Sequence, residues 1–305
     1  MQNSAEVNVK NFVCRYRGSS VETVRYVLAQ LSFGAGYNGD IYRTNWCDVF
    51  EAGLNQALAS WLEKGISIRT IALYLSIAKE FAEFHFEQSM ISAEVLCSVK
   101  RMRLAGVKEA PLRGDPRRAI SNSERDILIK SCLEDLRPNG LRDAALVSVL
   151  FGTGINRNQL VALRIENVNI ESGVISSVNC RFDSVKFYIS DWALPHLSRW
   201  LDCRLSVGAT SRSPLFCRIF KSGKIADKPL TGRGVFHILQ ERSDLACLDK
   251  VVRPSDARFT LGVKLLDEHG LLVGRKALNL AGLTETLYYD LRSDEEVHRL
   301  IRKTL

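Results

Sequence analysis

The sequence has no long apolar run and no cysteine pairs of the kind that hold a metal. No stretch approaches the ~18 consecutive apolar residues that a membrane span requires, so we expect no membrane segment and no membrane partner. The first residues, MQNSAEVNVKNF, lack the basic and apolar segments of a secretory signal. The eight cysteines form no C-x-x-C pair, and no histidine pair completes a zinc site. We therefore expect reduced thiols, a cytoplasmic protein and no metal.

The composition is that of a globular protein with an excess of positive charge. Its 305 residues suggest two domains at roughly 150 residues each. A hydrophobic fraction of 46% and a charged fraction of 25% exclude a disordered chain. The 42 Lys and Arg outnumber the 34 acidic residues and give a net charge of +8, which favours a polyanionic partner.

Residues 1–105 predict a small all-α domain of four amphipathic helices. Ser19 and Glu22 match a capping box at the start of the first helix. Four amphipathic helices are enough to enclose one core. Apolar residues recur at helical spacing over 19–34, 46–64, 67–86 and 92–102.

Residues 106–120 interrupt this pattern and mark a domain boundary. Two glycines and two prolines break any helix there, and positive charge is concentrated in and just before the segment. Such a linker is either a solvated hinge or a segment that lies along a phosphate backbone. On the second interpretation, the DNA-binding residues are Lys100, Arg101, Arg103, Lys108, Arg113, Arg117 and Arg118.

Residues 121–305 predict a second, mainly α domain with a small β-hairpin. Ser121 and Glu124 match another capping box ahead of a helix. Two strands are expected over 174–178 and 185–189, joined by a turn. Further helices are expected over 142–150, 159–164, 192–206, 234–245 and 256–268 and near the C-terminus.

The order of these elements, together with several motifs, resembles the tyrosine recombinase (phage integrase) family over most of the chain. SVETVRYVLAQL and GISIRTIALYLSIAKEFAEF are similar to helices of that family's N-terminal core-binding domain. The stretch LRDAALVSVLFGTGINRNQLVALRIENVN resembles the one with the first catalytic arginine. RPSDARFTLGVKLL resembles the His-x-x-Arg box, and GLTETLYYDL resembles the nucleophile region. The resemblance implies a four-helix, SAM-like core-binding domain followed by an α-rich catalytic domain.

The family's chemistry implies site-specific recombination of double-stranded DNA without a metal or nucleotide cofactor. A tyrosine hydroxyl attacks a phosphodiester and forms a 3′-phosphotyrosyl intermediate. Arginines and a Lys or His donor bind the non-bridging oxygens, and a lysine protonates the leaving 5′-oxygen. The resemblance also implies a dimer or tetramer on DNA, with or without a second recombinase as partner.

Some catalytic positions of the family are matched in this sequence. Arg258 matches the arginine of the His-x-x-Arg box. The nucleophile position falls on Tyr288 or Tyr289. The lysine position falls on Lys186, or it is taken by Arg181, which is a poor proton donor because it stays protonated.

Other positions depart from the family pattern. Asn156 stands at the first catalytic arginine, and Arg157 follows one position later, about 100° further round a helix. Gln159 replaces an acidic residue, Ser255 replaces the histidine of the box, and Leu283 stands where a His or Trp donor is usual. Each lost donor costs about 2.7–4 kcal/mol of transition-state stabilisation. Two hypotheses follow from the resemblance: a recombinase with a divergent active site, or an inactive DNA-binding accessory protein that partners an active recombinase. The remaining alternative is a basic all-α protein of another class.

Overall fold

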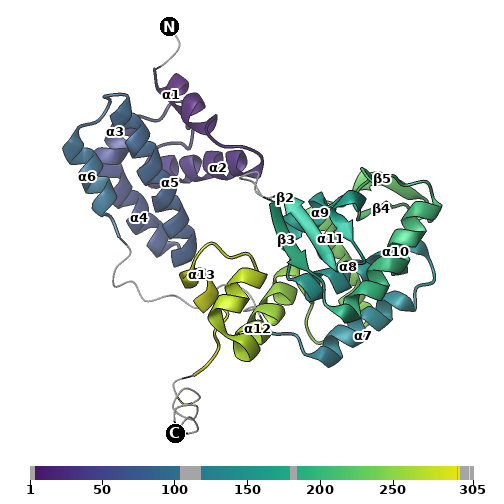
Figure 1. Cartoon of the computed structure of the whole chain (residues 1–305). Coiled ribbons are helices and arrows are strands. Elements are labelled where there is room, and N and C mark those ends of the chain that lie inside the picture. Colours follow the sequence, from purple (N-terminus) through teal and green to yellow (C-terminus); the bar gives the residue numbers. More distant parts are fainter. Residues whose placement is uncertain (1–3, 104–117, 179–183, 294, 296–301, 303–305) are drawn as a thin grey trace. The chain divides into compact units, whose positions relative to one another are not determined.

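The computed structural model describes residues 4–103, 118–178, 184–293, 295 and 302. The chain forms two compact units, Met1–Pro116 and Arg117–Leu305 (Figure 1). The predicted linker, 106–120, spans the point of division, and most of it lies outside the described residues. No helix among the described residues is both long and apolar enough to span a bilayer.

The first unit is entirely helical in its described part, and its core is rich in aromatic side chains. Phe81 on α5 lies at its centre, with ring centroids 4.6 Å from Phe12 and 4.9 Å from Trp46. Ser67 caps α5 by accepting a hydrogen bond from the Thr70 N–H. Its helical elements are α1 (Ser4–Val13), α2 (Ser19–Gly34), α3 (Trp46–Asp48), the π-helix η1 (Val49–Gly53), α4 (Leu54–Glu63), α5 (Ile68–Glu87) and α6 (Ala93–Arg101).

The first unit differs from the sequence prediction in three details. Helix α1 was not predicted, because Val9, Phe12 and Val13 alone are buried among residues 6–13 and its stability comes from packing on α5. The capping box expected at the start of α2 is absent, since Gly18 occupies the N-cap position without a side-chain hydrogen bond. The helix expected over 46–64 is divided by a π-helical turn.

The second unit is built around α8, whose residues from Arg142 to Thr153 are all buried. Helix α7 begins with the predicted capping box, in which Ser121 accepts from the Glu124 N–H and the Glu124 carboxylate accepts from the Ser121 N–H. The helical elements are α7 (Asn122–Leu133), α8 (Pro138–Thr153), α9 (Arg157–Ala162), η2 (Ile165–Asn167), η3 (Asp191–Ala193), α10 (Leu194–Ser206), α11 (Gly232–Leu245), α12 (Pro254–Ala277) and α13 (Leu283–Leu287).

Two small antiparallel sheets complete the second unit. The predicted hairpin is confirmed as β2 (Val174–Val178) and β3 (Ser184–Tyr188), and the buried pair Ile175 and Phe187 joins it to the core. A short strand, β1 (Val168–Asn169), extends this sheet beyond β2. A second hairpin, not predicted, pairs β4 (Cys217–Ile219) with β5 (Ile225–Pro229). The predicted class, mainly α with a small β element, is confirmed.

A buried ion cluster ties α7, α8 and α11 together. Asp143 on α8 accepts hydrogen bonds from Arg142 Nε at 2.8 Å and from Arg242 Nε at 2.9 Å. Arg242 also reaches Asp135 just after α7, with 2.8 Å between Nη2 and Oδ2. Burial raises the pKa of Asp143, while its two arginines oppose that shift. The cluster fixes α11 against α8, and these helices frame the site described next.

Candidate active site

The site begins at the turn that ends α8. Gly154 adopts a left-handed conformation with φ 63°, and its N–H bonds to the Leu150 carbonyl at 3.0 Å. A Cβ added at Gly154 would lie 2.7 Å from Leu278, so the turn is packed against the end of α12. This close packing sets where the chain enters α9 and therefore where the following polar residues point.

Asn156 is the N-cap of α9. Its Oδ1 accepts a hydrogen bond from the Gln159 N–H at 2.9 Å, and its Nδ2 donates to the Gln159 side chain. A neutral amide pair thus occupies the two positions where the family pattern has an arginine and an acid. The capping role accounts for Asn156 locally, because Asn is among the best N-cap residues.

Arg157 is the first residue of α9, and its exposed side chain lies across the start of α11. A Cβ added at Gly232 would lie 2.9 Å from Arg157 Nε, which places the guanidinium beside the start of α11. Although Asn156 stands at the family's arginine position, Arg157 still places a positive charge at the start of α9.

Arg258 bridges two parts of the unit from the second turn of α12. Its Nη1 donates to the Gly154 carbonyl at 2.6 Å, and its Nη2 donates to the Leu278 carbonyl at 2.7 Å. These bonds hold the guanidinium between the end of α8 and the end of α12. An arginine held this way needs no reorganisation to bind an anion beside it.

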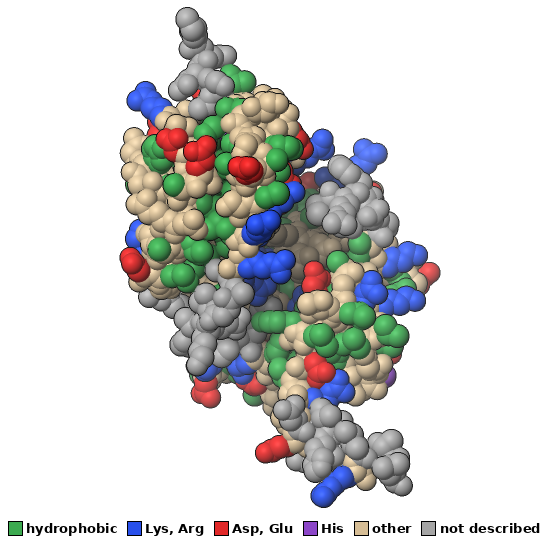
Figure 2. Space-filling model, turned by 90° about the vertical axis from the view of Figure 1, so that its left-hand side faces the viewer, with side chains coloured by type: hydrophobic (Ala, Val, Ile, Leu, Met, Phe, Trp, Pro, Cys, Tyr) green, Lys and Arg blue, Asp and Glu red, His purple; other side chains and the backbone are tan. Residues whose placement is uncertain are grey.

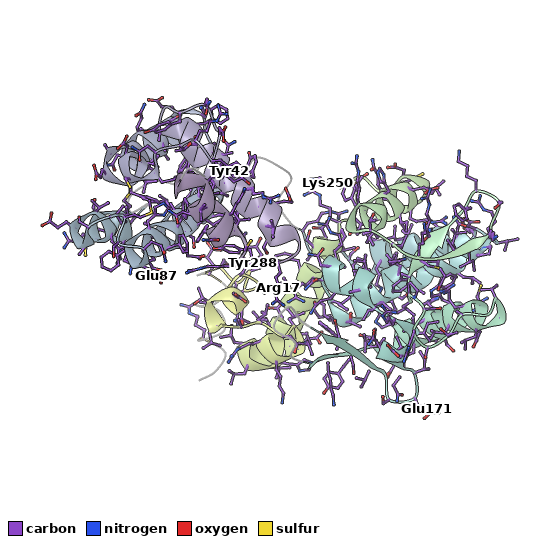
Figure 3. All side chains as sticks on the ribbon, turned by 90° about the horizontal axis from the view of Figure 1, so that it is seen from above. Arg17, Tyr42, Glu87, Glu171, Lys250 and Tyr288 are labelled. Carbon is purple, nitrogen blue, oxygen red and sulfur yellow. The ribbon has the colours of Figure 1, made fainter. Side chains whose placement is uncertain are left out.

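The two tyrosines after α13 have different surroundings. Tyr289 is 6% exposed, and its ring lies against Gly262 of α12, where an added Cβ would be 2.3 Å from Tyr289 Cδ1. Tyr288, labelled in Figure 3, is 45% exposed, and its ring meets Phe259 edge-on at 6.0 Å. The structure therefore brings Tyr289, rather than Tyr288, to the same pocket as Arg258.

These residues meet in an open pocket of about 440 Å³. Three arginines line it, from α9, from the start of α12 and from its second turn, and none of the described lining residues is acidic. The pocket is lined by Asn156, Arg157, Phe236, Arg253, Pro254, Ser255, Arg258 and Tyr289.

One lining residue, Arg253, was not identified from the sequence. It is the N-cap of α12, two residues before Ser255, and its N–H donates to Asp256 Oδ2 at 2.8 Å. In the sequence, Arg253 is marked only by its place directly before Pro254 in the segment that resembles the His-x-x-Arg box. This place indicates a site residue only once the fold brings the start of α12 beside α9.

Other predicted site residues lie outside this pocket. Lys186 is exposed on β3, and its carbonyl accepts from Asn279 Nδ2 at 3.0 Å, but it does not line the pocket. Leu283 opens α13 and is 46% exposed, also away from the pocket lining. Arg181 lies outside the described residues.

The basic residues around the linker have varied surroundings. Lys100 pairs with Glu83 at 2.6 Å within the first unit, and Arg101 and Arg103 are exposed. Arg118 forms an ion pair with Glu124 at the start of α7. Lys and Arg side chains are visible on the face shown in Figure 2. Three more of the predicted DNA-binding residues lie outside the described part: Lys108, Arg113 and Arg117.

Comparison with known proteins gives one consistent result. No family model matches the chain. It is 23% identical over 247 residues to the tyrosine recombinase XerC of Escherichia coli O157:H7, covering 80% of this chain and 77% of that protein. It is 20% identical over 250 residues to XerD of Staphylococcus haemolyticus, covering 81% and 80%.

Solved structures share the fold. The Tn1549 transposon integrase in complex with transposon right end DNA superposes with a TM-score of 0.71, at 14% identity, over 98% of both chains. A lambda integrase dimer bound to a COC′ core site gives a TM-score of 0.58 at 12% identity, over 92% of this chain and 91% of that one. The chain therefore has the fold of these integrases. Its sequence is similar to tyrosine recombinases over 80% or more of its length.

Proposed function

We propose that the protein is a site-specific DNA recombinase that cleaves and rejoins strands through a 3′-phosphotyrosyl intermediate, with Tyr289 as the nucleophile. The observation that carries this proposal is the convergence of Tyr289, Arg258 and Arg157 in one open pocket without an acidic side chain among its described lining residues. A phosphodiester carries one negative charge, and planar guanidinium groups match its oxygens in pairs.

The proposed reaction needs no external energy. The Tyr289 hydroxyl loses its proton and forms a bond to the scissile phosphorus, the bond from phosphorus to the 5′-oxygen breaks, and that oxygen takes up a proton. Rejoining is the same step in reverse, with a 5′-hydroxyl of another strand as attacker. Arg258 and Arg157 stabilise the charge on the non-bridging oxygens. Lys186 or Arg181, on the β2–β3 hairpin, is the proposed proton donor to the 5′-oxygen.

DNA binding is assigned to both parts of the chain. We propose that residues 1–105 bind one side of the duplex, that 106–120 form a basic linker, and that 121–305 form the catalytic domain, assembled as a dimer or tetramer on DNA. The basic residues near the linker make this binding salt-dependent, with a log–log slope near −0.9 per phosphate contacted.

A second function is favoured by one specific observation. Asn156 is engaged as a helix cap, and Ser255 and Leu283 are neutral where the family pattern has donors. An accessory protein that binds DNA beside an active recombinase would keep the fold and lose these groups. Sequence-specific binding without cleavage is its signature.

The two functions are separated by trapping the covalent intermediate. A nicked duplex from the ends of the element or locus that carries the gene releases a short strand on cleavage and so prevents rejoining. We expect a covalent adduct on a denaturing gel with the wild type and with Tyr288→Phe, and none with Tyr289→Phe. An adduct lost only in Tyr288→Phe refutes the assignment of Tyr289. Specific binding with no adduct from any variant supports the accessory function.

A further inference from the structure

We propose that Arg253 is a phosphate-contacting residue of this pocket and supplies the positive charge that Asn156 and Ser255 do not. The inference deepens the function proposed above and rests on it for its biological setting. Its physical content, an anion site that depends on Arg253, can be tested without catalysis.

The position of Arg253 is fixed by the start of α12. Its backbone N–H is held by Asp256 at 2.8 Å, and Pro254 follows it with a restricted φ. The backbone is therefore ordered at the point where the side chain enters the pocket lining, together with Ser255 and Arg258 of the same helix. An ordered cation binds an anion with less loss of conformational entropy than a mobile one.

The pocket gathers cations from the ends of two helices. Arg253 is the N-cap of α12 and Arg157 is the first residue of α9, so both cations lie at helix ends that carry partial positive charge. Arg258 adds a third guanidinium to the same pocket, and no carboxylate is among the described lining residues. An anion bound in this pocket is within reach of guanidinium groups from three positions, and guanidinium groups bind phosphate oxygens strongly.

The departures from the family pattern explain why another arginine is needed. Asn156 uses its amide to cap α9 and has no positive charge to offer. Ser255, in the histidine position, lines the same pocket and is also uncharged. Arg253 precedes Ser255 by two residues and restores a cation at that end of α12. A guanidinium can also contact two phosphate oxygens at once, which a single imidazole donor cannot.

The first test measures anion binding by the whole protein. Inorganic phosphate is titrated and binding is followed by ³¹P NMR and by the rise in Tm. The variants are Arg253→Ala, Arg253→Lys and, as a matched control, Arg199→Ala, an exposed arginine of α10 outside the pocket lining. We expect Arg253→Ala to weaken phosphate binding about tenfold or more, Arg253→Lys to weaken it less, and Arg199→Ala to leave it unchanged.

The rise in Tm with phosphate separates a binding role from a structural one. If Arg253 binds the ligand, Arg253→Ala loses most of the rise in Tm that phosphate gives the wild type, whatever its Tm in phosphate-free buffer. A lower Tm together with unchanged phosphate affinity shows a structural residue and overturns the inference. A wild type that binds no phosphate overturns it as well.

The second test uses the nicked duplex with either a normal or an uncharged methylphosphonate group at the scissile position. We expect Arg253→Ala to slow adduct formation about 100-fold on the phosphate substrate and much less on the methylphosphonate. Equal slowing on both substrates contradicts a role in charge neutralisation. Arg253-dependent phosphate binding without any wild-type adduct supports the anion site and refutes the strand-cleavage function.

Discussion

The contact between Tyr289 and Gly262 provides a quantitative test of the proposed nucleophile. A Cβ added at Gly262 would lie 2.3 Å from Tyr289 Cδ1, 2.7 Å from Cε1 and 2.9 Å from Cγ. Carbon atoms in contact are normally about 3.5–4.0 Å apart, so the variant Gly262→Ala must displace the ring by more than about 1 Å. A displacement of 1 Å at a reacting group costs on the order of 100-fold in rate.

The effect on stability should be much smaller than the effect on rate. Alanine in a helix interior is favoured over glycine by about 1 kcal/mol. Overpacking at a tight contact costs about 1–3 kcal/mol, so the net loss of stability is about 0–2 kcal/mol. We expect Gly262→Ala to unfold near the wild-type temperature and to form the covalent adduct about 100-fold more slowly.

The control is Gly282→Ala in the same region of the chain. Gly282 has extended backbone geometry with φ −136°, and an added Cβ there meets nothing within 4 Å. Adduct formation is followed on the nicked duplex, and Tm is measured by circular dichroism. If Gly262→Ala forms adduct at the wild-type rate with an unchanged Tm, the ring of Tyr289 is not positioned for attack, and Tyr289 is refuted as the nucleophile.

Two further predictions concern the ion cluster behind the site. Arg242→Met removes the buried arginine that pairs with both Asp143 and Asp135, and should lower the unfolding free energy by about 3–5 kcal/mol in urea titrations. Loss of the exposed Lys10–Glu6 pair should change the unfolding free energy by less than about 1 kcal/mol. The pKa of Asp135 is lowered below its ordinary 3.8 by hydrogen bonds, first from Arg137 and then from Arg242. The stability that the ionised Asp135 contributes is therefore present above pH 3.8 and is lost as the pH falls further. An acid-unfolding curve of Arg137→Ala that coincides with the wild-type curve would contradict this prediction.

The parts of the fold that sequence patterns predicted are those set by local chemistry. The capping box at Ser121 and Glu124 forms as expected, with both hydrogen bonds between neighbouring residues. The same pattern at Ser19 and Glu22 does not form a box, because α2 begins at Ser19 and its N-cap is Gly18. The hairpin of β2 and β3 follows from two short runs rich in β-branched and aromatic residues on either side of a turn. Helix α1 was missed because its stability comes from contacts between Phe12 and α5, about seventy residues away in sequence.

The candidate site was predictable only in part, for a related reason. Arg258 and the pair Tyr288 and Tyr289 stood in recognisable motifs. The choice of Tyr289 depends on which ring packs against Gly262 and enters the pocket, which motif spacing does not decide. Arg253 is one of many arginines in the sequence, and only the meeting of α9 with the start of α12 gives it a possible function.

The neutral pair at Asn156 and Gln159 offers a way to test whether Arg253 replaces a lost charge. Arginine at position 156 cannot accept the hydrogen bond that Asn156 takes from the Gln159 N–H at 2.9 Å, so Asn156→Arg alone loses the cap at a cost of about 0.5–2 kcal/mol. It also adds a cation beside Arg157 at the start of α9, which is unfavourable. Adding Gln159→Glu supplies an acidic partner in the first turn and should recover much of the lost Tm.

The double variant Asn156→Arg, Gln159→Glu therefore restores a charged pair in place of the amide pair. In the wild-type background we expect little gain in adduct formation, because Arg253 already supplies the charge. In the Arg253→Ala background we expect the double variant to raise the rate of adduct formation at least about tenfold. A coupling energy of this size is usual for groups that share one ligand. A double variant that gives no recovery there means that Arg253 and the residue at position 156 act on different parts of the substrate, and the replacement of one by the other is refuted.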